Sequence, residues 1–303
     1  MIKSFINYPG GKYKLLPQLK QYFPKEYVHF IDLFAGSAVV ATNIPASSVS
    51  ISAYDNNQYL IGLLQYVCDT DVEEILANTL KNIQHFNLTD TFNNGYMYYN
   101  VSSNEGLGSI NKANYNLLRK TFNDQVNNGY VDYSLLYVLI IFGFNNQMRF
   151  NKEGNFNNPV GKRDFNRQMR EKLFKFKNRI NSLKITFVMS DFRDVSTLIP
   201  DTFFYVDPPY LSTTAVYNEN GGWTVADEKD LLSYLDKIHQ SGNKFALSNV
   251  LTSKGKSNNI LRDWLLQNGD RYRVIHLNKS YANSNYQTSE KHGYSDEVLV
   301  INY

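Results

Sequence analysis

The sequence predicts an α/β fold: a mostly parallel sheet with an antiparallel edge strand, carrying an inserted, mainly helical domain that contains a β-hairpin. Short apolar runs of strand length recur in residues 1–56 and 181–303. A well-capped helical pattern separates two of them, which is typical of parallel strands joined by a helix. The stretch 57–180 is too long for a connection within the sheet, because such loops rarely exceed about 15 residues.

The first expected strands are "VHFIDLF" (28–34), which leads into the small-residue turn "AGSA", and "VSISAYD" (49–55), which ends on an acid. The later ones are "KITFVM" (184–189), "TFFYV" (202–206), "KFALSN" (244–249), "YRVIHL" (272–277) and "EVLVIN" (297–302). One helix between them starts with Thr224 and Asp227 at cap spacing and stops at Gly242. The last two strands have no helix between them, so we expect an antiparallel pair at one edge.

The inserted segment 57–180 shows helical patterns instead of strands. "TDVEEILANTLKNIQ" has Thr70 and Glu73 at capping-box spacing. The glycine-centred stretch "RFNKEGNF" (149–156) predicts a hairpin. We therefore expect a sheet domain formed by 1–56 and 181–303, with an inserted domain that supplies substrate specificity.

Composition excludes several classes of protein. The chain has 303 residues, of which 43% are hydrophobic and 19% charged, as in soluble globular proteins. A single cysteine, Cys68, excludes an internal disulfide and a cysteine-based metal site, and it fits a reducing cytoplasm. The five histidines show no ligand spacing, so we assign no metal. The longest apolar run, 135–144, is far shorter than the roughly 20 residues of a membrane helix, so we expect a cytoplasmic protein.

The net charge is only +3, which is weak evidence for a nucleic-acid partner. Its distribution says more, because the stretch 161–179 has eight lysines and arginines against two acids. A surface that faces phosphates has this composition, and so does a solvated helix face.

The stretch "FYVDPPYL" (204–211) places an acid and a tyrosine at the end of a strand. Two prolines remove two backbone donors and fix two φ angles, so the strand stops in one rigid conformation. In an open α/β sheet ligands bind at that end. The Asp207 carboxylate and the Pro208 carbonyl suit the two N–H groups of an exocyclic amine on a base, and Tyr210 offers a flat surface for stacking. The alternative is a Pro-Pro turn that merely ends a strand.

The turn "DLFAGSA" is not a dinucleotide fingerprint, because that needs G-x-G-x-x-G and only Gly36 is present. An acid about twenty residues further on, Asp55, suits the two hydroxyls of a ribose. An adenosyl compound without a pyrophosphate meets both conditions, which points to S-adenosylmethionine. The alternative is an ordinary tight turn.

Together these motifs resemble the Dam-type (alpha-group, D12 class) DNA adenine N6-methyltransferases. "NYPGGK", "DLFAGSA", "AYDNN", "MSDFRDV" and "DPPY" resemble the motifs of that family in its order, and the resemblance extends over nearly the whole chain. It implies a Rossmann-like S-adenosylmethionine-dependent methyltransferase sheet. The implied cofactor-binding residues are Tyr8, Gly10, Gly11, Lys12, Asp32, Phe34, Ala35, Gly36, Ser37, Asp55, Asn56, Asp191, Phe192 and Asp207. The implied catalytic residues are Asp207, Pro208, Pro209 and Tyr210.

The stretch "FNNQMRFNKEGNFNNPVG" (144–161) resembles the DNA-reading pattern of the same family. The resemblance implies a wedge beside the flipped base for Phe144 and Asn145, phosphate contacts for Asn151 and Asn157, and a guanine reader in Arg149, whose guanidinium suits a guanine edge. The DNA-binding residues expected here are Phe144, Asn145, Gln147, Arg149, Asn151, Asn157, Pro159, Lys162 and Arg163. A purely structural hairpin is the alternative.

The chain also departs from the family pattern. Ala38 stands where the family often has glycine, and Tyr8 replaces the commoner tryptophan. The segment 281–296 lacks the arginine-rich approach to the last strand that the family pattern leads us to expect, so its role stays open.

The resemblance implies a monomeric, site-specific DNA adenine N6-methyltransferase that acts on a flipped-out adenine in double-stranded DNA, with GATC as the default site. Whether a cognate restriction endonuclease accompanies it stays open. The rivals are methylation of RNA adenine or of cytosine N4, and a DNA-binding protein without activity.

Overall fold

A mixed sheet forms the centre of one of two units in the computed structural model, which describes residues 1–45, 49–211, 222–253, 255–277 and 295–303. The sheet unit comprises Lys12–Ala35, Ile44–Asn56 and Lys184–Tyr303. The helical unit comprises Met1–Gly11, Gly36–Asn43 and Asn57–Leu183. The helical unit thus takes in two short segments beyond the predicted insertion 57–180.

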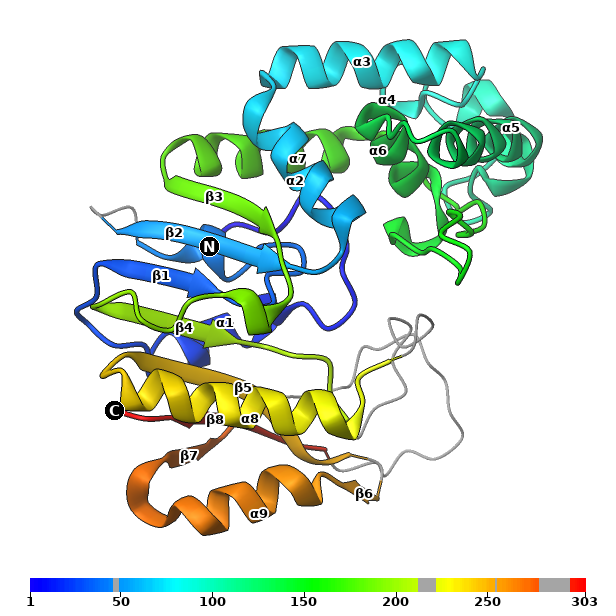
Figure 1. The fold of residues 1–303 in the computed structure, drawn as a ribbon. Helices are drawn as coiled ribbons and strands as arrows, with labels where there is room; N and C mark the ends of the chain where they lie inside the picture. Colours follow the sequence, from blue (N-terminus) through cyan, green and yellow to red (C-terminus); the bar gives the residue numbers. More distant parts are fainter. Residues whose placement is uncertain (46–48, 212–221, 254, 278–294) are drawn as a thin grey trace. The chain divides into compact units, whose positions relative to one another are not determined.

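The sheet has the order β3-β2-β1-β4-β5-β8-β7, and β6 lies off this path and pairs with β5 (Figure 1). The strands are β1 (His29–Asp32), β2 (Ser50–Asp55), β3 (Lys184–Met189), β4 (Thr202–Val206), β5 (Lys244–Ser253), β6 (Lys256–Ser257), β7 (Arg273–His276) and β8 (Ser295–Ile301). β1 to β5 run parallel, whereas β8 is antiparallel to both β5 and β7. The predicted mostly parallel sheet is confirmed, and its antiparallel strand lies one place in from the edge.

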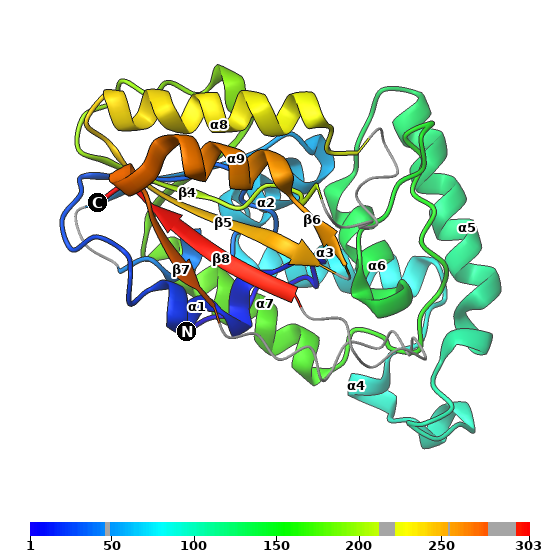
Figure 2. The same cartoon turned by 90° about the horizontal axis from the view of Figure 1, so that it is seen from below.

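Strand β4 shows why the sheet needs cover on both faces, since all five of its residues are buried. Phe203 packs on one face against Phe23 and Tyr27, which follow the short helix α1 (Leu16–Leu19). Phe204 and Val206 point to the other face. There α8 (Val225–Gln240) and α9 (Asn259–Asn268) lie side by side over the strands (Figure 2).

Helix α8 begins and ends where the sequence predicts. Thr224 and Asp227 form a reciprocal capping box, in which the Thr224 hydroxyl accepts from the Asp227 N–H and the Asp227 carboxylate accepts from the Thr224 N–H. Gly242 follows the helix with a φ of +78°, a conformation that favours glycine.

The helical unit is built around α6 (Tyr133–Phe142), whose eight residues from Leu135 onward are all buried. A helix that is apolar all round needs neighbours on every side. Three of these are α2 (Gln58–Asp69), α3 (Val72–His85) and α5 (Gly108–Asn127) (Figure 1). The remaining α-helices described here are α4 (Thr91–Asn94) and α7 (Arg167–Asn181), and Phe5 packs on Phe176 of α7. Within the described residues, no helix is both long and apolar enough to cross a membrane.

Two local predictions for this unit need correction or refinement. The predicted capping box at Thr70 is wrong, because Thr70 ends α2 by donating its N–H to Tyr66, and the N-cap of α3 is Asp71. In the glycine-centred stretch 149–156, Phe150 and Phe156 form one isolated antiparallel bridge. The two arms of the predicted hairpin are not extended into β-strands.

Candidate active site

The carboxyl ends of the parallel strands bring four acids to one edge of the sheet. Asp32 ends β1 in register with Ala53 of β2 and Tyr205 of β4, and Asp55 ends β2 opposite Met189. Asp191 lies two residues beyond β3, and Asp207 lies one beyond β4. β1 and β4 flank the point at which the strand order reverses, where open α/β sheets bind ligands.

Asp207 is held on one side of its carboxylate. Lys12 Nζ lies 2.7 Å from Asp207 Oδ1, and the Tyr210 hydroxyl donates to the same oxygen at 3.1 Å. Among the described residues, Oδ2 has no such partner, so it is available to a ligand. Lys12 Nζ also lies 5.0 Å from the centroid of the Tyr210 ring, which ties the cation to both residues.

The Asp207 carboxyl group and its partner Lys12 are largely buried. Burial raises the pKa of the Asp207 carboxyl, and the Lys12 ammonium acts against that rise. The two side chains are 17% and 3% exposed respectively. An ion pair that is this poorly hydrated at a strand end is typical of a functional site. Pro208 and Pro209 follow at once and hold the chain without backbone donors.

Sequence reasoning missed one residue of this network. Glu297 of β8 is 1% exposed, and its Oε1 lies 3.4 Å from the Tyr210 hydroxyl. One hydroxyl therefore faces two carboxyl groups, those of Asp207 and Glu297. The only signal in the sequence was an acid at the start of the apolar run "EVLVIN".

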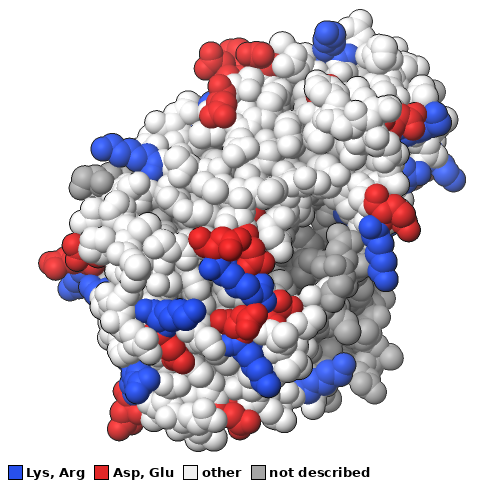
Figure 3. Space-filling model, viewed as in Figure 1, with Lys and Arg blue, Asp and Glu red and all other residues white. Residues whose placement is uncertain are grey.

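The Asp-Phe segment is fastened to the start of α8. Asp191 caps the 3-10 turn Phe192–Asp194 by accepting the Arg193 N–H. The Arg193 guanidinium bridges Asp191, Asp227 and Asp230 at 3.1, 2.6 and 2.9 Å. Acidic and basic side chains accordingly lie next to each other over α8 in Figure 3. Asn56, beyond the end of β2, is exposed.

Three glycines that were predicted to bind the cofactor have structural roles of their own in the helical unit. Gly11 donates its N–H to the Tyr8 carbonyl, and Gly10 has a φ of +77°. Gly36 has a φ of +50°, and a Cβ added to it would lie 2.9 Å from Cε1 of Tyr8. The tyrosine ring thus packs where only glycine leaves room. Ser37 is 5% exposed, whereas Ala38 is fully buried and also has a positive φ, 56°.

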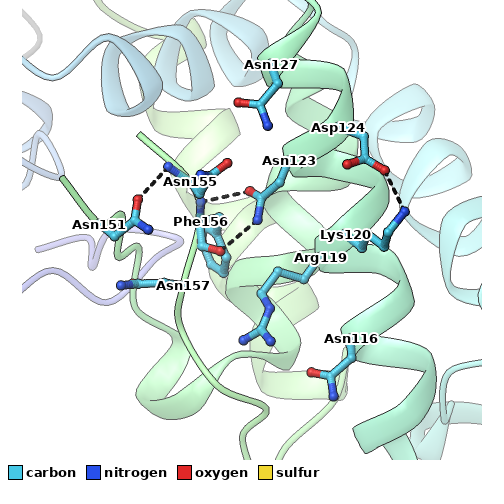
Figure 4. A pocket seen from close by; sticks show the side chains of 10 residues that line it. All are labelled: Asn116, Arg119, Lys120, Asn123, Asp124, Asn127, Asn151, Asn155, Phe156 and Asn157. Carbon is cyan, nitrogen blue, oxygen red and sulfur yellow. Dashed lines mark hydrogen bonds and ion pairs between the residues drawn. The ribbon is translucent and has the colours of Figure 1, made fainter. Parts of the chain in front are cut away.

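The predicted guanine reader Arg149 is turned toward the loop 144–158, to which it belongs. Its Nε donates to Asn157 Oδ1 at 2.8 Å and its Nη2 to the Asn157 carbonyl at 2.9 Å. The Asn151 side chain accepts from the Asn155 N–H. Asn123 of α5 bonds both backbone groups of Phe156, as Figure 4 shows. The loop and α5 therefore form one hydrogen-bonded body.

A surface hollow of about 490 Å³ lies between α5 and this loop (Figure 4). Its lining is polar apart from one phenylalanine and consists of Asn116, Arg119, Lys120, Asn123, Asp124, Asn127, Asn151, Asn155, Phe156 and Asn157. Two predicted DNA contacts, Asn151 and Asn157, are brought together here.

The other predicted DNA-binding residues differ in how they are placed. Phe144 is 52% exposed, and Asn145 next to it has a φ of 55°. Gln147 forms an isolated parallel bridge with Asn7. Pro159 and Lys162 are exposed. Arg163 donates to the Tyr96 hydroxyl and the Ser103 carbonyl.

Part of the basic run 161–179 serves the helical unit itself. Lys177 is 4% exposed and donates to the Cys68 carbonyl, and Arg179 donates to the Thr42 carbonyl. Arg170 stacks on the Phe92 ring at 3.7 Å. Lys177 therefore does not belong to an exposed surface, and a phosphate-facing role for the rest of the run stays a prediction.

Comparison with known proteins gives the family. Residues 8–283 match the model of the D12 class of N6 adenine-specific DNA methyltransferases. The chain is 35% identical to the type II methyltransferase M.FokI of Planomicrobium okeanokoites and 34% identical to the modification methylase StsI of Streptococcus sanguinis, with all of this chain aligned in both cases. It is 26% identical to a DNA adenine methylase of Vibrio cholerae over 78% of this chain and 76% of that protein. The chain spans 43% of the length of M.FokI and of StsI. It belongs to the D12 class of N6 adenine-specific DNA methyltransferases.

Proposed function

We propose that this chain transfers a methyl group from S-adenosylmethionine to N6 of an adenine in double-stranded DNA. The observation that carries the proposal is the Asp207 carboxylate, which is bound through Oδ1 by Lys12 and Tyr210 and has Oδ2 available. A poorly nucleophilic amine needs a fixed acceptor of this kind.

The residues at the strand ends fit the methyl donor. Asp55 ends β2, where an acid can bind a ribose. The rings of Phe34 and Phe192 contact each other, with centroids 5.5 Å apart, and would offer an aromatic surface to an adenine. The turn after β1 has one glycine instead of the dinucleotide pattern, which fits an adenosyl group without a pyrophosphate. S-adenosylmethionine would supply a methyl group activated by a sulfonium sulfur.

The chain's own groups would act on the adenine amine. Asp207 Oδ2 accepts one N–H and the Pro208 carbonyl accepts the other, which favours a pyramidal nitrogen with its lone pair directed away from the ring. Burial raises the pKa of Asp207, and Lys12 opposes that rise, which favours the ionised carboxylate as the acceptor. The Tyr210 ring stacks on the base, which must leave the duplex at a cost of a few kcal/mol.

The loop 144–158 would read the DNA. Exposed Phe144 would occupy the space that the flipped base leaves, and Asn151 and Asn157 would contact phosphates. Arg149 would turn from the two oxygens of Asn157 to a guanine edge, which also offers two acceptors.

The recognition site and the partners of this chain are also proposals. GATC is the first site to test. The relatives at 34% and 35% identity are named as modification or type II methyltransferases, which favours a restriction-modification role with a cognate endonuclease and a site of its own. We propose that the domain acts as a monomer in the cytoplasm.

The test is methyl transfer from labelled S-adenosylmethionine to unmethylated duplex DNA, with N6-methyladenine mapped by sequencing. Label on adenine within one short motif is expected. Asp207→Ala should abolish transfer and leave cofactor binding largely intact. Label on RNA or on cytosine, or full turnover by Asp207→Ala, would overturn the proposal.

A further inference from the structure

We infer that Trp223 forms a third wall of the surface that binds the adenine ring of the methyl donor, and that Glu228 positions it. The inference rests on the proposed function, because it takes S-adenosylmethionine as the ligand.

Trp223 completes a cluster of three aromatic rings at the carboxyl edge of the sheet. Its ring lies 5.6 Å from that of Phe34 and 5.8 Å from that of Phe192. Phe192 is 4% exposed, whereas Phe34 and Trp223 are only partly buried. Partly exposed aromatic faces beside strand ends offer a planar ligand a surface to stack on.

The orientation of the indole is fixed by a buried acid. Trp223 Nε1 donates to Glu228 Oε2 at 2.6 Å, and Glu228 is 0% exposed. The other oxygen of Glu228 accepts from Asn258 at 2.7 Å and from Asn249 at 3.3 Å. Burial raises the pKa of Glu228, while these donors favour its charged form. Such a fully bonded buried carboxylate holds its partners in one arrangement.

The same segment is tied to the predicted adenine site from the other side. Thr224 follows Trp223 and shares a capping box with Asp227, and Arg193 joins Asp227 to Asp191. Trp223 is therefore held next to the Asp191–Phe192 pair by two independent networks.

Fluorescence gives a direct readout, because the chain contains only two tryptophans. Trp264 stacks on Tyr272 of the sheet unit at 4.6 Å and donates to Asp236, outside this cluster. Trp264→Phe thus leaves Trp223 as the sole reporter. Titration of this variant with S-adenosylmethionine or S-adenosylhomocysteine should change the Trp223 emission at the same concentrations at which calorimetry detects binding.

Substitution measures the contribution to affinity. Trp223→Leu should weaken cofactor binding about tenfold, which corresponds to about 1.4 kcal/mol, whereas Trp223→Phe should retain most of the affinity. Glu228→Gln should weaken binding only while Trp223 is present, so that Trp223→Leu combined with Glu228→Gln binds no worse than Trp223→Leu alone.

The outcomes separate the inference from the proposed function. Wild-type affinity in Trp223→Leu, or calorimetric binding without any change in Trp223 emission, overturns the wall. An equal loss from Glu228→Gln with and without Trp223 overturns the positioning role. No binding of either compound to the wild-type chain would instead refute the proposed function.

Discussion

Replacing Lys12 by methionine should move the acid limb of the pH–rate profile upward. Lys12 Nζ lies 2.7 Å from the Asp207 carboxylate, and at an effective dielectric constant of about 20 this gives an attraction of roughly 6 kcal/mol, part of which offsets desolvation of the ions. An opposite charge at this distance typically lowers the pKa of a carboxyl by about 1–3 units. Burial raises the pKa of Asp207 and nearby Glu297 adds to the rise, so loss of Lys12 leaves both unopposed except by the Tyr210 hydroxyl.

The sign follows from the role proposed for Asp207. Only the ionised carboxylate leaves Oδ2 a good acceptor, so turnover is lost as the pH falls through the pKa. The wild-type limb should lie above the value of about 3.9 for a free aspartate, and Lys12→Met should shift it up by about one to two pH units.

Single-turnover methyl transfer at saturating donor and DNA, measured from about pH 5 to 9, checks this shift. Lys12→Arg keeps the charge and serves as the matched control, with a limb close to wild type. The reasoning is refuted if the limb of Lys12→Met coincides with that of the wild type. A rate lowered by one factor at every pH would assign Lys12 to ligand binding instead.

Three further changes test other parts of the site. Asp55→Ala should weaken cofactor binding at least tenfold, since hydrogen bonds to a charged group contribute about 1.5–3 kcal/mol; unchanged affinity by calorimetry would end the ribose assignment. Arg149→Ala should relax specificity at one guanine, seen by comparing methylation across single-base variants of the site, whereas a uniform loss would make Arg149 an anchor of the loop. Ala38→Gly should raise the melting temperature by about 1–3 °C, because it relieves a left-handed conformation worth about 1–2 kcal/mol at some cost in chain entropy; a lower melting temperature would show that the Ala38 methyl group packs well enough to outweigh the strain.

The positions of most strands and the mostly parallel character of the sheet could be predicted, because these strands are short apolar runs bounded by turn residues. The start of α8 was equally predictable, since Thr224 and Asp227 satisfy each other locally. The pattern at Thr70 has the same spacing and failed, because that residue already ends the preceding helix. Spacing alone does not show which of two neighbouring helices a polar residue serves.

Contacts between residues that lie far apart in the chain could not be predicted from local sequence patterns. Glu297 and Trp223 reach the site only because β8 pairs with β5 and α8 packs on the sheet, and no local pattern marks either residue. The basic run was ambiguous for a related reason: a lysine such as Lys177 looks solvated in sequence, but the structure buries it against a carbonyl.

The way the loop 144–158 is held has an evolutionary consequence. Asn123 bonds the N–H and carbonyl of Phe156, Tyr115 and Arg119 donate to the carbonyl of Asn158, and the Asn158 amide donates to the carbonyls of Phe144 and Gln147. Apart from the side chain of Asn158, the loop residues take part in these bonds through main-chain atoms, which most substitutions preserve. Side chains that take no part in these bonds, such as that of exposed Phe144, can therefore change while the loop keeps its shape, so the surface of the loop can diverge between related chains on a constant backbone.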